Sequence, residues 1–129
     1  MSGRYLLDTN IVIALFAGEL PVLSRIDLAE SVFIPSIVLG ELYFGAFKSA
    51  RAAENVARVD ELAALRAVLP VDTETARWYG QVKERLKRQG RPIPENDIWV
   101  AALARQHQLA LASRDPHFTS VSDLILESW

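Results

Sequence analysis

Four acidic residues in this sequence have the chemistry and the surroundings of a metal site. Asp8 is the only charge in "YLLDTNIVIALF", and Glu41 is the only charge in "VFIPSIVLGELYFGAF". Asp97 directly precedes the apolar segment "IWVAALA", and Asp115 stands in "SRDPHF". A buried carboxylate costs roughly several kcal/mol unless it is paired or binds a metal ion. The pattern therefore predicts that these acids act together in one functional site.

Clustered carboxylates repel one another and raise each other's pKa values, and a divalent cation removes that repulsion. Hard oxygen ligands select Mg²⁺ or Mn²⁺ over zinc when no histidine or cysteine assists. The two histidines add little to this expectation, because His107 lies far along a predicted helix and His117 is isolated in a loop. We therefore expect the four acids to be catalytic and to hold Mg²⁺ or Mn²⁺.

The usual task of an all-carboxylate magnesium site is phosphoryl chemistry, in which the ion activates water and neutralises charge on phosphate oxygens. The sequence has no glycine-rich phosphate loop and no G-x-S-x-G motif. The "DTN" segment also lacks the second aspartate of a D-x-D phosphatase signature. Water is the nucleophile that these observations favour.

Each acid also has an ordinary structural explanation. Asp8 can form a turn with the backbone just after it, and Glu41 can pair with an arginine from another helix. Asp97 and Glu95 are suited to the first turn of a helix, where an acid contributes only about 0.3–1 kcal/mol. Asp115 precedes a proline, which is common in loops. A turn at Asp8, however, accounts for none of the other acids.

The elements that must position these acids alternate between apolar strands and helices. Strands are expected at 5–7, 31–35, 68–71, 109–113 and 121–129. Three helices are expected in the first half of the chain, at 10–17, from Pro21 onward, and after a cap at Ser36. Three more are expected over much of 51–69, from a cap at Asp72 or Thr73 to Gln89, and over 95–108.

This alternation predicts an α/β fold with a central parallel sheet covered on both faces, in a single domain spanning 1–129. Binding sites in such sheets lie beyond the carboxyl ends of the strands. Asp8 follows the first predicted strand and Asp115 follows the fourth, so we expect both at that edge.

Composition narrows the class of protein. The chain has 129 residues, 50% of them hydrophobic, which suffices for one core. No apolar run is long enough to cross a bilayer, and Asp8 interrupts the only apolar stretch that would suit a signal peptide. With no cysteine, disulfides and thiolate metal sites are excluded. A net charge of −2 excludes a globally basic nucleic-acid binder. From the composition as a whole, we expect a cytoplasmic protein.

The motifs "YLLDTNIVIALF", "SIVLGELYFGA", "ENDIWVAALA" and "ASRDPHF" resemble, in order and spacing, the four acidic motifs of the PIN domain. More narrowly, they resemble the VapC-type toxins of bacterial toxin–antitoxin systems. The resemblance implies a three-layer α/β/α sandwich and an Mg²⁺- or Mn²⁺-dependent endoribonuclease. By that resemblance Asp8, Glu41 and Asp97 match the three core acids, and Asp115 matches a more variable fourth.

The same resemblance implies supporting residues. Thr9 and Asn10 complete the "DTN" signature and help to order the acid, and Ser113 occupies a small hydroxyl position before the fourth acid. Glu95 departs from the pattern, because many relatives have aspartate there; its longer side chain puts a role as ligand of a second metal in doubt.

Relatives of this kind are usually homodimers within a larger assembly, neutralised by a VapB-like antitoxin whose C-terminal segment wraps the toxin and often places an arginine near the acids. Apolar surfaces around "IVIALF" and "IVLGELYFGAF" are candidates for docking that segment, with core packing as the alternative. The basic stretch "KERLKRQGR" supplies candidate RNA contacts. The residues that we single out for RNA are Lys83, Lys87, Arg4 and Arg114.

Other functions remain open on sequence alone. A receiver-like signalling domain would need an adjacent acid pair near the N-terminus and a lysine after a late strand, which the sequence lacks. A non-enzymatic regulator that binds RNA or protein on the same fold would not need all four acids. The sequence does little to distinguish a metal-dependent phosphatase for small molecules from a nuclease.

Overall fold

A parallel five-stranded sheet runs through the molecule, whose computed structural model describes residues 3–129. The strands lie in the order β3-β2-β1-β4-β5, and every neighbouring pair is parallel. Their bounds are β1 (Arg4–Leu7), β2 (Ser31–Pro35), β3 (Ala67–Leu69), β4 (Ala110–Ala112) and β5 (Leu126–Glu127).

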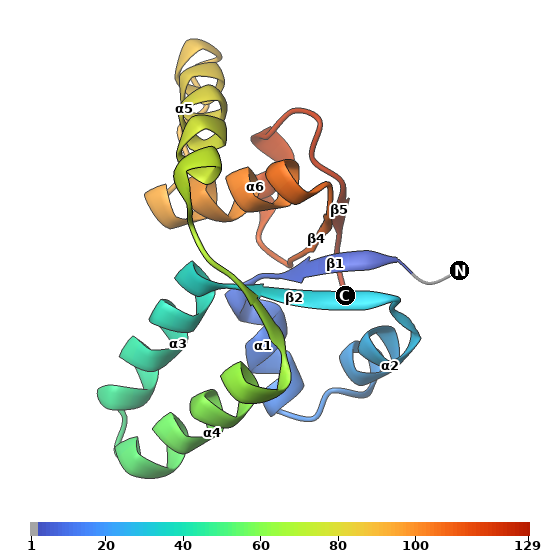
Figure 1. Ribbon diagram of the computed structural model, residues 1–129, viewed down its shortest axis with the longest axis vertical. Coiled ribbons are helices and arrows are strands. Elements are labelled where there is room, and N and C mark those ends of the chain that lie inside the picture. Colours follow the sequence, from blue (N-terminus) through green and yellow to red (C-terminus); the bar gives the residue numbers. More distant parts are fainter. Residues whose placement is uncertain (1–2) are drawn as a thin grey trace.

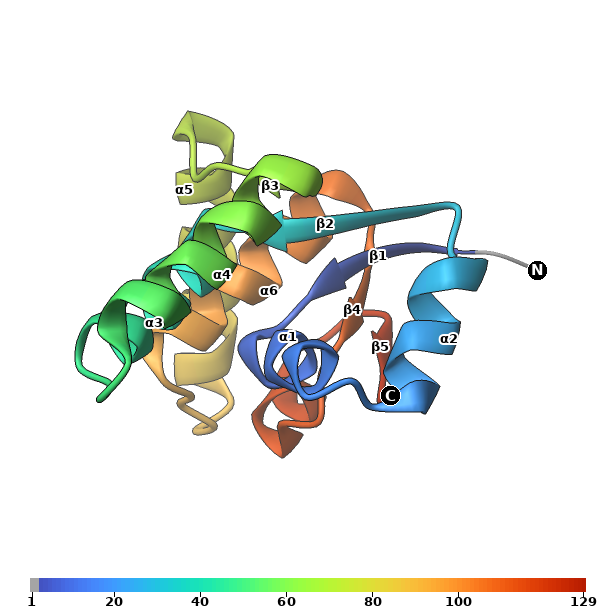
Figure 2. The same ribbon diagram turned by 90° about the horizontal axis from the view of Figure 1, so that it is seen from below.

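Helices fill the connections between these strands. They are α1 (Thr9–Phe16), α2 (Leu20–Leu28), α3 (Ser36–Phe47), α4 (Ala52–Leu65), α5 (Thr73–Arg88), α6 (Glu95–His107) and the short 3₁₀ helix η1 (Pro116–Ser120). Figures 1 and 2 place α5 and α6 on one side of the strands and α1 to α4 on the other. The predicted three-layer α/β/α sandwich with a central parallel sheet is confirmed.

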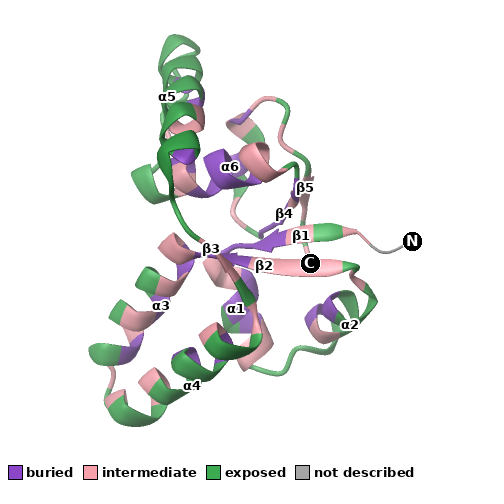
Figure 3. Ribbon diagram, viewed as in Figure 1, coloured by how far each residue is buried: buried purple, intermediate pink, exposed green. Residues whose placement is uncertain are grey.

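The core lies where the central strands meet α1 and α6. Leu6, Leu7, Ile34 and Leu111 have no exposed surface, which is expected of parallel strands covered on both faces. Helix α6 is buried almost throughout its middle, and Figure 3 shows this burial concentrated on α6 and the carboxyl halves of β1 and β2. Rigid packing here fixes the strand ends that carry the acids.

The register of β1 and β4 decides where the functional edge lies. Leu7, the last residue of β1, is paired with Ala112, the last residue of β4. The backbone N–H of Asp8 continues the ladder and donates to the Ala112 carbonyl at 3.0 Å. Strand order reverses at β1, since the chain moves outward to β2 and β3 and then returns to β4. Open α/β sheets bind ligands at such a switch point.

Three local predictions are wrong. The fifth strand covers only Leu126–Glu127 rather than 121–129. Ser36 does not cap α3: it is the first helical residue, and Pro35 precedes it without a side-chain cap. The third strand begins at Ala67 rather than 68 and ends at Leu69, because Pro70 has no N–H to extend the pairing with β2. The Asp72 cap of α5 is confirmed by its bond from the Thr75 N–H.

None of the helices within residues 3–129 combines the length and the apolar character that crossing a membrane requires.

Candidate metal centre

Asp8 lies at the junction of β1 and α1 and is only 5% exposed. Its carboxylate accepts hydrogen bonds from the Ser113 hydroxyl at 2.7 Å, the Thr9 N–H at 2.9 Å and the Asn10 side-chain amide at 3.2 Å. Burial raises the pKa of Asp8 above its ordinary value, and Asp115 adds to the rise, while the Ser113 bond opposes it. The bond from Ser113, which follows β4, shows that Asp8 does more than form a local turn.

Asp97, Asp115 and His117 meet beside Asp8. Asp97 lies in the first turn of α6, and Asp115 caps η1. The His117 Nδ1 lies 3.1 Å from the Asp97 Oδ2 and 3.0 Å from the Asp115 Oδ1. One donor atom from each lies within 4.8 Å of the others, and among residues 3–129 this is the group close enough to share an ion.

The acids influence one another electrostatically. Burial raises the pKa of Asp97, and the negative charges of Asp115 and Asp8 raise it further, while the hydrogen bond with His117 lowers it. Groups that repel in this way gain most from a cation placed among them. Asp8, Asp97 and Asp115 therefore influence one another, although Asp8 lies outside the group whose donor atoms are within 4.8 Å of one another. Their joint role as metal ligands stays a prediction.

Glu41 joins this cluster indirectly. It lies on α3, is exposed, and accepts a hydrogen bond from the Thr9 hydroxyl at 2.9 Å. Since Thr9 also donates its backbone N–H to Asp8, one residue connects the two carboxylates. Glu41 is not part of the tight group around His117. Its side chain is long enough to turn inward, so its place as a ligand stays a prediction.

Asn10 and Ser113 hold the loops after β1 and β4 together. The Asn10 side-chain oxygen accepts from the Arg114 backbone N–H at 3.0 Å, and its amide lies 3.4 Å from the Ser113 hydroxyl. The Ser113 oxygen accepts from the Asp115 N–H at 3.0 Å while donating to Asp8. These bonds fix the spacing between two of the acids.

Comparison with known proteins identifies the family of proteins that have this arrangement. The family model described as "PIN domain" matches residues 5–124. The chain belongs to the PIN domain family. It is 37% identical to "Ribonuclease VapC2" of Haemophilus influenzae, with 98% of each chain covered. It is 33% identical to "tRNA(fMet)-specific endonuclease VapC" of Shigella flexneri, again over 98% of each. Within the PIN domain family, its similar relatives are thus VapC proteins.

Solved structures with a similar fold also come from VapBC complexes. A complex of VapBC2 from Rickettsia felis bound to a promoter DNA fragment contains a chain with a TM-score of 0.91 and 27% identity, covering 98% of both chains. DNA-bound VapBC from Salmonella typhimurium matches with a TM-score of 0.91 and 29% identity, covering 100% of this chain and 99% of that one. The fold of this PIN domain is therefore that of the toxin chains in such pairs.

The side chains of Glu95, Lys83 and Arg114, also predicted for the site, have partners other than the acids described above. Glu95 accepts from the Lys83 ammonium at 2.6 Å and from the Tyr79 hydroxyl, so α5 holds it. The Lys83 hydrogen bond lowers the pKa of Glu95, and the same contacts raise the pKa of Lys83. Arg114 pairs with Glu19 at 2.8 Å. Both predicted cations already have carboxylate partners.

Arg4 and Lys87 differ from these paired cations. Arg4 is the first residue of β1, at the amino end, whereas Asp8 follows the carboxyl end. Asp8 follows Arg4 by four positions along an extended strand, a distance of about 13 Å. Arg4 therefore lies toward the opposite edge of the sheet from the acids. Lys87 is exposed in the last turn of α5.

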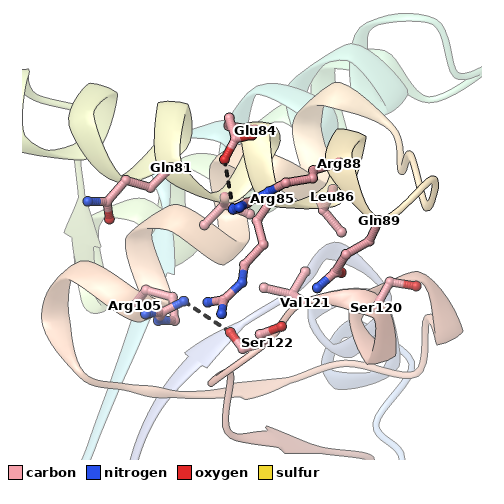
Figure 4. Close-up of a pocket in the computed structure, with 11 residues that line it drawn as sticks. Gln81, Glu84, Arg85, Leu86, Arg88, Gln89, Arg105, Ser120, Val121 and Ser122 are labelled. Atoms are coloured by element: carbon pink, nitrogen blue, oxygen red, sulfur yellow. Dashed lines mark hydrogen bonds and ion pairs between the residues drawn. The ribbon is translucent and has the colours of Figure 1, made fainter.

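Arginines gather in a hollow between α5 and α6 of this PIN domain. A cavity of about 290 Å³ lies between α5, α6 and the segment after η1, and Arg85, Arg88 and Arg105 line it (Figure 4). Arg105 donates to the Ser122 carbonyl at 3.0 Å, and Arg88 pairs with Glu84 at 3.0 Å. The basic stretch predicted from the sequence thus lines one wall of a basic hollow.

His117 is the functional candidate that sequence reasoning dismissed. As a single histidine in a loop it gave no metal-binding spacing. A signal was present, because His117 follows Asp115 by two residues across Pro116, and a tight turn there returns its side chain to the acid. The proximity of both to Asp97 could not be read from the sequence, because it depends on how η1 packs on α6.

Proposed function

We propose that this protein is the endoribonuclease toxin of a toxin–antitoxin pair and hydrolyses RNA phosphodiester bonds with Mg²⁺ or Mn²⁺. The observation that carries the proposal is the group formed by Asp97, Asp115 and His117, which Ser113 connects to Asp8 through hydrogen bonds. Relatives named as VapC ribonucleases, and one named as a tRNA(fMet)-specific endonuclease, support the same reaction.

The donor set suits a hard divalent cation. Burial raises the pKa values of Asp8 and Asp97, and the charge of Asp115 adds to both shifts, so the cluster carries an electrostatic cost that a cation would remove. Carboxylate oxygens are the ligands that Mg²⁺ and Mn²⁺ prefer. When bound, the ion supplies an activated water and neutralises charge on the phosphate oxygens.

The protein's own residues keep this site in order before substrate arrives. Ser113 and Asn10 fix the orientation of the Asp8 carboxylate, and Thr9 connects Asp8 with Glu41. Because these side chains are already oriented, the protein does not have to rearrange them during the reaction. Such preorganisation is a main source of an enzyme's rate. Glu41, in this proposal, completes the ligand set or orients the attacking water.

RNA has room beside Glu41. A hollow of about 640 Å³ there is lined by residues of α1, α3 and the start of α6, including Lys48 and Asn96. A lysine and an amide suit phosphate and base contacts in a single-stranded RNA. The hollow lined by Arg85 and Arg105 would hold phosphates farther along the strand. Lys87 stays a candidate for the same role.

Lys83 and Arg114 can contact RNA only by exchanging partners. A phosphate would have to compete with Glu95 for Lys83 and with Glu19 for Arg114. Both ion pairs are partly exposed, and solvent weakens such pairs, so exchanging one carboxylate for a phosphate costs little. Arg4 is the weakest of the four predicted contacts, because it lies toward the far edge of the sheet.

The partner that we propose is a VapB-like antitoxin, with the toxin as a homodimer in the assembly. VapBC complexes are among the similar solved structures. Part of the apolar surface predicted to dock the antitoxin is core, since Val12, Val38 and Leu42 are buried. Ile13 is 55% exposed, however, and lines a hollow of about 240 Å³ between α1, α3 and α4. That hollow suits an apolar segment of a partner.

The function is tested by incubating the purified protein with total cellular RNA in Mg²⁺ or Mn²⁺ and mapping the cut ends. We expect cleavage that EDTA stops and that added ion restores. Asp97→Asn should abolish it, and the matched variant Asp27→Asn, at an exposed site on α2, should cut at the wild-type rate.

Cleavage that persists in EDTA, or that survives Asp97→Asn at full rate, would overturn the proposed mechanism. Hydrolysis of a small phosphomonoester such as p-nitrophenyl phosphate, without any cut in RNA, would instead assign the site to a phosphatase.

A further inference from the structure

We propose that His117 is a nitrogen ligand of the ion at this site, so that the centre is a mixed imidazole–carboxylate site rather than an all-carboxylate one. The proposal rests on the metal dependence of the proposed function. It concerns a residue that is not one of the four acids, although it lies in the same motif as Asp115, and it comes from the geometry of η1.

Distances around His117 match a shared coordination sphere. Neighbouring ligands of an octahedral ion with bonds of 2.0–2.1 Å lie about 3.0 Å apart. The His117 Nδ1 lies 3.1 Å from the Asp97 Oδ2 and 3.0 Å from the Asp115 Oδ1. These are hydrogen-bonding distances, and they also leave one imidazole nitrogen spaced as a third vertex beside two carboxylate oxygens.

The backbone holds His117 in this position. Asp115 caps η1 by accepting the His117 backbone N–H at 2.9 Å, and its own N–H is held by the Ser113 hydroxyl. The next residue, Phe118, is 1% exposed and anchors the short helix in the core. The backbone of His117 is therefore fixed from both sides along the chain, which aims its imidazole at the acids as a ligand position requires.

An imidazole ligand changes which ions bind best. Affinity for nitrogen-containing sites rises from Mn²⁺ through Co²⁺ to Ni²⁺, whereas Mg²⁺ prefers oxygen ligands alone. The sequence argument for Mg²⁺ or Mn²⁺ assumed that no histidine assists. With His117 present, we expect the site to favour Mn²⁺ and Co²⁺ over Mg²⁺ more strongly than four carboxylates would.

Pulsed electron paramagnetic resonance on the Mn²⁺-loaded protein tests this without measuring activity, because a directly bound imidazole gives a nitrogen hyperfine coupling. We expect that coupling in the wild type and in His107→Asn, the matched control at the chain's other histidine. We expect its loss in His117→Asn. Titration calorimetry should show Co²⁺ affinity falling about tenfold or more in His117→Asn, with Mg²⁺ affinity changing less than about threefold.

Circular dichroism would confirm that each variant is folded. A nitrogen coupling that survives His117→Asn, or equal losses of affinity for all ions, would overturn the role of His117 while leaving the nuclease proposal intact. Failure of the wild type to bind any divalent ion, together with cleavage in EDTA, would instead overturn the metal dependence on which both proposals rest.

Discussion

At the scale of single residues, the site is a balance between the cost of buried charge and the bonds that offset it. Asp8 is 5% exposed and has a pKa raised mainly by that burial. Three hydrogen bonds, from Ser113, Thr9 and Asn10, act in the opposite direction. The Ser113 hydroxyl is the nearest of these donors and is itself buried, so its bond should matter most to Asp8.

Replacing Ser113 tests this balance. Ser113→Ala removes a hydroxyl bond to a buried carboxylate, and such bonds are worth about 1.5–3 kcal/mol. We expect the free energy of unfolding at neutral pH to fall by about 2 kcal/mol, measured by urea denaturation. Ser24→Ala, at an exposed position on α2, should change it by less than about 0.5 kcal/mol. Equal stability of the two variants would refute this role of Ser113.

The sequence singled out the acids but not their hydrogen-bond and ion-pair partners. Asp8 and Glu41 were visible because each is a lone charge in an apolar segment, a property of neighbouring residues alone. The pairing of Arg114 with Glu19 joins residues 95 positions apart, and that of Lys83 with Glu95 joins two helices. Such contacts depend on packing between elements, which periodicity does not encode.

At the scale of elements, η1 is the short segment that brings His117 to Asp97 and Asp115. It carries His117, begins at the Asp115 cap, and is held to the core by Phe118. The sequence predicted the strands and long helices on either side but no element here, because five residues have no measurable helical period. The shift of β3 to Ala67–Leu69 has a similar cause, since pairing with β2 sets its bounds.

Phe118→Ala should show that η1 needs this anchor. Removing a fully buried phenylalanine leaves a cavity and costs about 3–5 kcal/mol. We expect that loss in the free energy of unfolding and, in protein still folded at low temperature, weaker Mn²⁺ binding. Phe44→Ala, which removes a side chain that is 67% exposed, should cost less than about 0.5 kcal/mol. If both variants unfold at the same denaturant concentration, η1 is not anchored as described.

At the scale of the whole molecule, the strand order brings distant acids to one edge. The alternation of strands and helices was enough to predict a parallel sheet, and therefore an edge with all carboxyl ends together. The order β3-β2-β1-β4-β5 was not predictable from that alternation, yet it is what makes β1 and β4 neighbours and joins Asp8 to Asp115.

Stability should respond to pH in a direction set by these acids. Asp97 has a pKa raised from 3.8 in the folded protein, so above 3.8 the folded state holds a proton that the unfolded state has lost. The free energy of unfolding of the wild type, compared with Asp97→Asn in EDTA, should therefore fall as pH rises from about 4 through that raised pKa.

A bound ion should reverse this loss. Ion at about 100 times its dissociation constant should add about 2.7 kcal/mol at neutral pH, and less at pH 5, where protons compete. Thermal unfolding with Mn²⁺ and with EDTA measures both effects. A wild type that gains stability relative to Asp97→Asn over this pH range, or that Mn²⁺ stabilises no more than it stabilises the variant, would contradict the shared acid cluster.

The central claim is that the carboxylates at the β1–β4 edge carry out metal-dependent cleavage of RNA. The most direct measurement is the initial rate at which wild type and Asp8→Asn cut an end-labelled RNA in Mn²⁺, with Asp27→Asn as control. We predict wild-type rates for the control and a loss of at least about a thousandfold for Asp8→Asn, because the ion and its water lose their best-fixed ligand. An Asp8→Asn protein that is folded and cuts RNA at the wild-type rate would contradict the account.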